Sequence, residues 1–462
     1  MSTFPQMARL SGRILIGSAL TGLLSQASAY SLIDAYQDAL GNDAELASAR
    51  ASLEADRQLI PLARSRTLPS AGASAEIARE FYSPDPGSSS NFTSQTYGVS
   101  LSYPIYSPVD RVAVDQSQLQ VQASEARLLS AQQDLVLRVA EAYFNVLAAE
   151  NNYETTQAEK TAIAEQLAAA KRNFEVGTAT ITDQQEAQAR FDLAVAQEVA
   201  AQNQLEVQRA ALQLLTGQPV PALADLSTNV ELKGPQPAVE SAWTQQARQD
   251  NLTVQQAALG AEVARREIDR QRYAGRPTLS AVGSVGHARN PSSSLSGYNI
   301  NSASVGLQLA VPLYTGGAIQ AGIRQAAASL DQIQADLEVA RRQAEQAART
   351  SYLGLISGLG QVRALEAAEK SSKLALDSNR LGYRVGVRIN IDVLNAQQQL
   401  FSTQRDLARA RYDVLVNGLR LQATAATLDE EDLRELSALL APRTKVTKPD
   451  APEPKPLSKK KK

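Results

Sequence analysis

Motifs that could perform catalysis or hold a metal are not found in this chain of 462 residues. There is one histidine, His287, and no cysteine, which argues against a histidine metal cluster and a thiolate site. The sequence has no phosphate-binding glycine loop, no His-Glu-x-x-His motif, no Gly-x-Ser-x-Gly elbow and no obvious acid and base pair of carboxylates. We therefore expect no catalytic residue, no metal, no cofactor and no enzymatic activity.

Short motifs that contain proline or glycine instead occur in duplicate, at a shift of 208 or 209 residues. Tyr103-Pro104-Ile105-Tyr106 recurs as Val311-Pro312-Leu313-Tyr314, and Phe174-Glu175-Val176-Gly177 recurs as Tyr383-Arg384-Val385-Gly386. A register kept over half of the chain indicates duplication of a whole structural unit. The elements that position these motifs should therefore also occur twice.

The N-terminus is typical of a secretory signal peptide. Arg9 and Arg13 precede an uncharged apolar run, and Ala27-Ser28-Ala29 satisfies the small-x-small cleavage rule. We expect residues 1–29 to be removed. No later stretch has 18 uninterrupted apolar residues, so we expect no transmembrane helix in the mature chain. The formal net charge of −2 and the lack of a basic face argue against nucleic-acid binding.

Each half contains two segments in which apolar and small polar residues alternate, the period of a half-buried strand. Loop-forming segments rich in Pro, Ser and Asn separate them, which predicts two β-hairpins at about 70–106 and 278–314. Strands of about 10 to 14 residues are long enough to cross an outer membrane. The residues expected to face lipid are Tyr97, Val99, Leu101, Tyr103, Val305, Leu307 and Leu309.

Four strands cannot close a barrel, and an open edge in lipid leaves backbone groups unsatisfied. Copies of the chain would then have to pool their strands. Eight strands from a dimer leave no lumen because side chains fill such a barrel, whereas twelve from a trimer leave a pore. A soluble β-sandwich fragment between coiled coils is the alternative for these segments.

Helical periodicity dominates the rest of the chain. Helical patterns cover about 30–66 and 238–276, and two very long helices are expected over 108–174 and 317–383. A tight Val-Gly turn joins each long helix to a shorter one, over 182–215 and 391–427. The predicted domain organisation is a signal peptide (1–29), a first repeat (30–217), a connector (218–237), a second repeat (238–428) and an equatorial segment with a disordered basic tail (429–462).

In order and spacing, these motifs resemble the TolC-type outer-membrane export channels. The resemblance covers the mature chain to about Leu440 and rests on the Val-Gly turns together with Ala142-Tyr143-Phe144-Asn145-Val146-Leu147, Ile181-Thr182-Asp183 and Ile391-Asp392-Val393-Leu394. It implies a mainly α protein with transmembrane β structure, a homotrimer in which twelve strands form one outer-membrane barrel, and a long helical barrel in the periplasm. The implied partners are outer-membrane lipid, a periplasmic adaptor (membrane fusion protein) and an inner-membrane ABC or proton-driven (RND-type) transporter.

The resemblance also implies roles for individual residues. A polar gating network would hold the periplasmic tip shut: Asp183 would accept a hydrogen bond from Tyr383 within a chain, and Arg388 would reach Thr182 and Asp183 of a neighbouring chain. Such donors and a carboxylate form charge-assisted hydrogen bonds. Breaking them would let the inner helix pair swing outward.

Two further sites follow from the same resemblance. The narrowest point would be lined by two rings one helical turn apart, of which Asp392 supplies the first and the uncharged Asn395 stands at the second. We therefore expect a weaker cation preference than two acidic rings produce. The two turns, with Val176, Gly177, Val385 and Gly386, are the expected contact with the adaptor.

The expected function is passive conduction of type I secreted proteins, drugs or small molecules from an inner-membrane transporter to the outside, with opening by an iris-like movement of the periplasmic helices. The alternative is a periplasmic coiled-coil adaptor or structural scaffold that does not enter a membrane. A scaffold has no reason to carry the paired alternating segments twice, so we favour the channel. The sequence does not identify the cargo.

Overall fold

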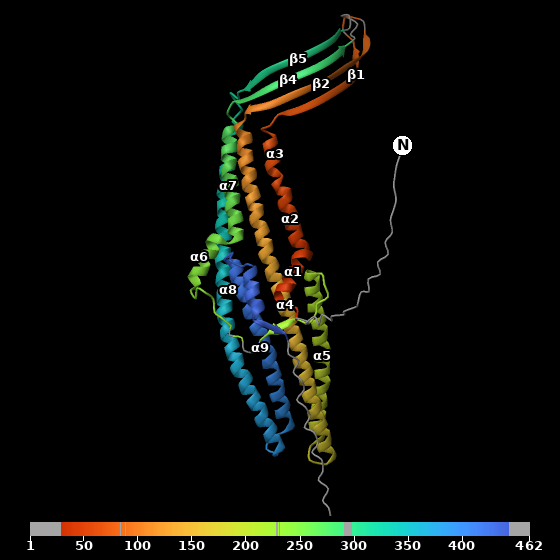
Figure 1. The fold of residues 1–462 in the computed structure, drawn as a ribbon, viewed down its shortest axis with the longest axis vertical. Coiled ribbons are helices and arrows are strands. Elements are labelled where there is room, and N and C mark those ends of the chain that lie inside the picture. Colours follow the sequence, from red (N-terminus) through yellow and green to blue (C-terminus); the bar gives the residue numbers. More distant parts are fainter. Residues whose placement is uncertain are drawn as a thin grey trace, which may run out of the picture.

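The structure is a computed structural model that describes residues 29–83, 85–87, 89–227, 230, 232–290 and 298–442. Residues 1–28 of the expected signal peptide, and the basic tail from 443 onward, lie outside the described residues. The described part is elongated, with a β-sheet at one end and helices that run lengthwise below it (Figure 1). None of its helices combines the length and the apolar character needed to cross a membrane.

The element order repeats, as expected from the duplicated motifs. The first half comprises α1 (Leu32–Asn42), α2 (Ala44–Arg57), α3 (Leu59–Ser65), β1 (Ser70–Tyr82), β2 (Ser90–Tyr106), α4 (Pro108–Glu175) and α5 (Ile181–Thr216), followed by β3 (Ala224–Leu226). The second half comprises α6 (Glu240–Asp250), α7 (Leu252–Tyr273), β4 (Thr278–Asn290), β5 (Tyr298–Ala310), α8 (Ala318–Arg384), α9 (Asn390–Thr424), α10 (Glu430–Ala438) and β6 (Leu440–Pro442).

The helical patterns over 30–66 and 238–276 are each interrupted, which the periodicity did not predict. Asp43 caps α2 by accepting a hydrogen bond from the backbone N–H of Leu46 at 2.7 Å. Asn251 caps α7 in the same way, from the N–H of Thr253 at 2.9 Å. Both residues have short polar side chains that satisfy the unpaired N–H groups at a helix start, so they begin new helices inside the apolar pattern.

The four long strands form one antiparallel sheet in the order β1-β2-β4-β5, because β2 pairs with β4 and joins the two hairpins. The pairings Ala75 with Tyr97, Tyr97 with His287, and His287 with Asn301 each join odd-numbered residues. Because side chains alternate between faces, odd-numbered residues therefore share one face of the sheet. All seven residues expected to face lipid lie on it: Tyr97, Val99, Leu101, Tyr103, Val305, Leu307 and Leu309.

Two helices, α4 and α8, extend along the shaft, and the shorter helices pack against them (Figure 1). α7 contacts both α4 and α8 nearer the sheet, whereas α9 contacts both of them further down. α5 packs on the lower part of α4, so the far end of the molecule consists of two helix pairs, α4 with α5 and α8 with α9.

The main hydrophobic core lies at the waist, where α1, α4, α5, α9 and α10 meet. Tyr143 and Phe144 are buried there, and Phe144 stacks on Tyr412 with ring centroids 5.8 Å apart. The Tyr143 hydroxyl lies 2.8 Å from the carbonyl oxygens of both Tyr30 and Ala224. These contacts attach the start of the described chain and the small sheet formed by β3 and β6 to the long helix α4.

Candidate gate at the helical tip

The two turns at the far end of the shaft have the same backbone geometry. Gly177 and Gly386 adopt φ of +77° and +80°, the left-handed region that disfavours a side chain, and each donates its N–H to a carbonyl three residues earlier. The valine before each glycine is largely exposed, Val176 at 72% and Val385 at 64%. The repeated motif therefore forms two matching turns, each of which exposes a valine just before its glycine.

The structure places the four predicted gating residues near these turns but gives three of them, Asp183, Tyr383 and Arg388, other partners within the chain. The Asp183 carboxylate accepts from the backbone N–H and the hydroxyl of Thr180, at 3.0 and 2.8 Å, and caps the start of α5. The phenol oxygen of Tyr383 accepts from the Asn173 side chain at 3.2 Å. The intrachain hydrogen bond expected from Tyr383 to Asp183 is thus absent from the described chain, because the carboxylate is turned toward its own helix start.

The side chain of Arg388 is exposed and lies 3.6 Å from Asp392, one turn further along the chain. Thr182 is exposed. The expected contacts of Arg388 with Thr182 and Asp183 would join two chains, so a single chain does not test them, and they stay a prediction.

Asn390 joins the two helix pairs and was missed by the sequence reasoning. Its side chain, only 1% exposed, accepts a hydrogen bond from Gln166 on α4 and donates one to the Asp183 carbonyl on α5 at 3.4 Å. A buried amide normally has its hydrogen-bonding groups satisfied, and here the partners come from the other pair. Asn390 occupies the position at which the first repeat has Ile181. A polar residue in place of an apolar one is a difference between the repeats from which the role of Asn390 could have been suspected.

Arg190 on α5 makes a second connection that the sequence reasoning missed. Its guanidinium donates to the side-chain oxygens of Gln398 at 2.6 Å and of Asn395 at 3.1 Å, both on α9. Apolar contacts accompany this link, since Leu394 of α9 lies in one buried cluster with Ile163 of α4 and Ala194 of α5. Asn395, expected only as the second ring of the constriction, therefore contacts the opposite helix pair.

Asp392 and Asn395 lie one turn apart on α9, as the constriction requires. Together with Arg388 they border an open hollow of about 380 Å³ between α8 and α9. The Arg388 guanidinium lies 3.6 Å from the Asp392 carboxylate, so the negative charge at this position is partly compensated inside one chain. Whether these residues line the narrowest point depends on the neighbouring chains, and the constriction stays a prediction.

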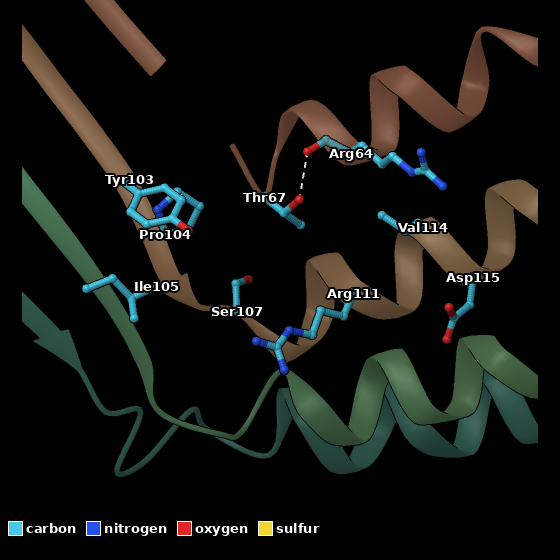
Figure 2. A pocket seen from close by; sticks show the side chains of 9 residues that line it. All are labelled: Arg64, Thr67, Tyr103, Pro104, Ile105, Ser107, Arg111, Val114 and Asp115. Carbon is cyan, nitrogen blue, oxygen red and sulfur yellow. Dashed lines mark hydrogen bonds between the residues drawn. The ribbon is translucent and has the colours of Figure 1, made fainter. Parts of the chain in front are cut away.

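A larger hollow, of about 650 Å³, lies where the sheet meets the helices. Figure 2 shows that its two cations, Arg64 on α3 and Arg111 on α4, extend to different sides, with Thr67 and Val114 between them. Arg111 lies over the Tyr106 ring at 5.7 Å. The side chains do not converge on one point, and no group of three or more metal-ligating side chains occurs among the described residues.

A sheet with one apolar face, mounted on a shaft of helices about 100 Å long, defines the class of an outer-membrane channel subunit. The comparison with known proteins agrees. The chain matches the family described as outer membrane efflux protein twice, over residues 35–218 and 243–427. The chain belongs to this family, and each repeat supplies one match.

Individual relatives extend over nearly the whole chain. The chain is 32% identical to the outer membrane protein TolC of Vibrio cholerae serotype O1, over 92% of this chain and 97% of that protein. It is also 32% identical to the alkaline protease secretion protein AprF of Pseudomonas aeruginosa, over 92% of this chain and 90% of the relative. The expected family, outer-membrane location and export function are confirmed.

Solved structures support the fold. A crystal structure of CusC superposes with a TM-score of 0.76 at 18% identity, over 86% of this chain and 92% of that one. The outer membrane protein VceC of Vibrio cholerae superposes with a TM-score of 0.71 at 18% identity, over 86% of this chain and 96% of that one. The predicted mainly α fold with a membrane β domain is confirmed. The family match and the relatives support the channel and not the alternative of a periplasmic coiled-coil adaptor or structural scaffold.

Proposed function

We propose that three copies of this chain form one duct that passively carries substrates across the outer membrane. The observation that carries this proposal is the four-stranded sheet, in which β1 and β5 each pair on one side only within the described residues. In lipid, such edges leave backbone groups unsatisfied unless another copy pairs with them. Three sheets joined edge to edge give twelve strands, enough to enclose a pore, whereas side chains would fill a barrel of eight.

The helical shaft suits passage through the periplasm. α4 has 68 residues, which at 1.5 Å per residue corresponds to about 100 Å. Val176 after α4 and Val385 after α8 are exposed at the end of the shaft far from the sheet. These apolar residues favour a contact with a periplasmic adaptor, which would connect the duct to an inner-membrane transporter. Energy would come from that transporter, because a passive duct only guides diffusion.

The cargo class is open between two possibilities that the names of the relatives suggest. The relatives AprF and PrtF are named for protease secretion, which suggests a protein cargo, and an ABC transporter would then deliver it. Two other relatives, BepC and TtgC, are named for efflux, and small molecules delivered by a proton-driven (RND-type) pump are the second possibility. A wide duct contacts its cargo loosely, so we assign the choice of cargo to the transporter and adaptor.

For the closed state we propose a gate in which Arg388 of one chain reaches Thr182 and Asp183 of its neighbour, with Tyr383 as a further donor at the tip once Asp183 turns from Thr180. The exposed Arg388 retains donors beyond the one near Asp392, because a guanidinium has five N–H groups. A neighbouring Asp183 could therefore accept from it. Removal of the donors should open the tip.

The test is single-channel recording in a planar lipid bilayer, with the wild type and a Tyr383→Phe, Arg388→Ser double variant. Discrete current steps that grow in the double variant would support both the pore and the gate. If purified trimers that retain their helical circular-dichroism spectrum give no steps in either form, the duct is wrong. Steps of equal size in both forms would remove the gate and keep the duct.

A further inference from the structure

The connection between α5 and α9 crosses from one helix pair to the other within a single chain. Opening by an outward swing of α8 and α9 separates those pairs, so every contact between them resists the movement. The guanidinium of Arg190 holds two acceptors on α9 at once, Gln398 at 2.6 Å and Asn395 at 3.1 Å. Two acceptors one turn apart match the fork of a guanidinium, which fixes the orientation of the helices as well as their distance.

The hydrogen bonds of Arg190 can be broken more readily than the ion pair that joins the two helix pairs further from the tip. Further from the tip, Arg405 of α9 pairs with Glu159 of α4 at 2.7 Å, and the Glu159 side chain is only 5% exposed. Breaking that pair would leave a buried carboxylate without its cation, which is costly. The Arg190 hydrogen bonds are exposed, so water can replace the partners when they separate. The buried pair suits an anchor and the exposed one a releasable contact.

We propose that Arg190 is a latch residue that holds α9 against α5 within each chain of the closed duct, and that Asn395 serves as its acceptor. The inference rests on the duct function proposed above and adds an intrachain closing contact to the interchain gate. Its consequence concerns Asn395, where the resemblance implies an acidic residue. An aspartate there would form an ion pair with Arg190, so it would tighten the latch as well as add negative charge.

Four variants separate these effects. Arg190→Ala removes the latch, Arg190→Lys keeps the charge but loses the fork, and Asn395→Asp strengthens the contact; the fourth variant combines Arg190→Ala with Asn395→Asp. Arg380→Ala is the control, because Arg380 is an exposed cation on α8 near the tip for which the described chain provides no hydrogen-bond or ion-pair partner.

Two readouts are measured on the same trimers. Single-channel recording gives the occupancy of the open level. Spin labels on Val176→Cys and Val385→Cys, diluted with unlabelled chains, give the distance between the two turns, and the absence of native cysteine makes the labelling specific.

We expect Arg190→Ala to raise open occupancy about tenfold, the size of effect that loss of a charged hydrogen bond produces, and to lengthen the label distance. The open occupancy of Arg190→Lys should lie between those of Arg190→Ala and the wild type. Asn395→Asp should lower open occupancy below that of the wild type, and this decrease should vanish when Arg190 is Ala.

The latch is refuted if Arg190→Ala leaves occupancy and distance unchanged in protein that conducts, or if Arg380→Ala produces the same increase. It is also refuted if Asn395→Asp lowers occupancy equally with and without Arg190. A wild type that forms trimers but never conducts would instead refute the proposed duct, and the label distances would still report whether Arg190 holds the helix pairs together.

Discussion

The ion pair between Asp43 and Arg138 should contribute measurably to the stability of the waist. The Asp43 carboxylate, 4% exposed, lies 2.7 and 3.1 Å from the two terminal nitrogens of Arg138. It also caps α2 through the N–H of Leu46. We consider two substitutions, Asp43→Asn, which keeps a good helix cap, and Asp43→Ala, which removes the cap as well.

The expected loss of unfolding free energy follows from the partners that Arg138 retains after the substitution. Removal of one member of a fully buried ion pair costs about 3 to 5 kcal/mol. Arg138 is 26% exposed and retains Asp134 at 2.8 Å and Glu45 at 3.2 Å, so its charge is not stranded. We therefore expect Asp43→Asn to lower the free energy of unfolding by about 2 kcal/mol. Asp43→Ala should lower it by about 1 kcal/mol more, the usual value of a helix cap.

The effect should depend on pH in one direction. The hydrogen bond from Arg138 holds the pKa of the Asp43 carboxyl below its ordinary value. A group whose pKa is lower in the folded state stabilises the fold above its unfolded pKa, about 3.9, and loses this contribution as the pH falls through the folded value. The difference between wild type and Asp43→Asn should thus be constant from pH 7 to about 5 and shrink below about 4.

The assay is urea-induced unfolding of detergent-solubilised protein followed by circular dichroism, with Glu45→Gln as the control. Glu45 also contacts Arg138, but its side chain is 74% exposed, so its loss should cost less than about 0.5 kcal/mol. If Glu45→Gln and Asp43→Asn lowered the free energy of unfolding equally, the reasoning would be refuted, because burial of the carboxylate would then make no difference to stability. A difference that grows below pH 4 would refute the assigned direction of the pKa shift.

Three further predictions concern the tip and the waist. Val385→Arg should abolish export in cells without lowering the amount of trimer, because it places a charge on an exposed apolar turn; loss of trimer would show that the turn serves folding. Asp392→Ala should reduce the cation preference measured by reversal potentials in a salt gradient, and an unchanged preference would contradict the constriction ring. Tyr143→Phe should lower the free energy of unfolding by about 1 to 2 kcal/mol, because its buried hydroxyl bonds the Tyr30 and Ala224 carbonyls, and an unchanged urea midpoint would contradict this.

The sequence alone determined the elements whose signals are local. The helix expected over 108–174 extends over Pro108–Glu175, and the strand alternation places Tyr97, Val99 and Leu101 on one face of the sheet. Helix and strand periods, proline positions and left-handed glycines act over a few residues, so they can be read without knowledge of the fold. The same holds for the repeat, which allowed the resemblance to the channel family to be recognised.

Tertiary structure alone decided which side chains meet. The link between Arg190 and Asn395 joins residues about 200 positions apart, as does that between Asn390 and Asp183. Such contacts depend on how α5 and α9 are rotated and offset against each other, and the repeat itself changes its shift from 208 to 209 residues between the hairpins and the turns. Local capping also directed Asp183 to Thr180 instead of Tyr383, because the carboxylate finds partners in its own helix start.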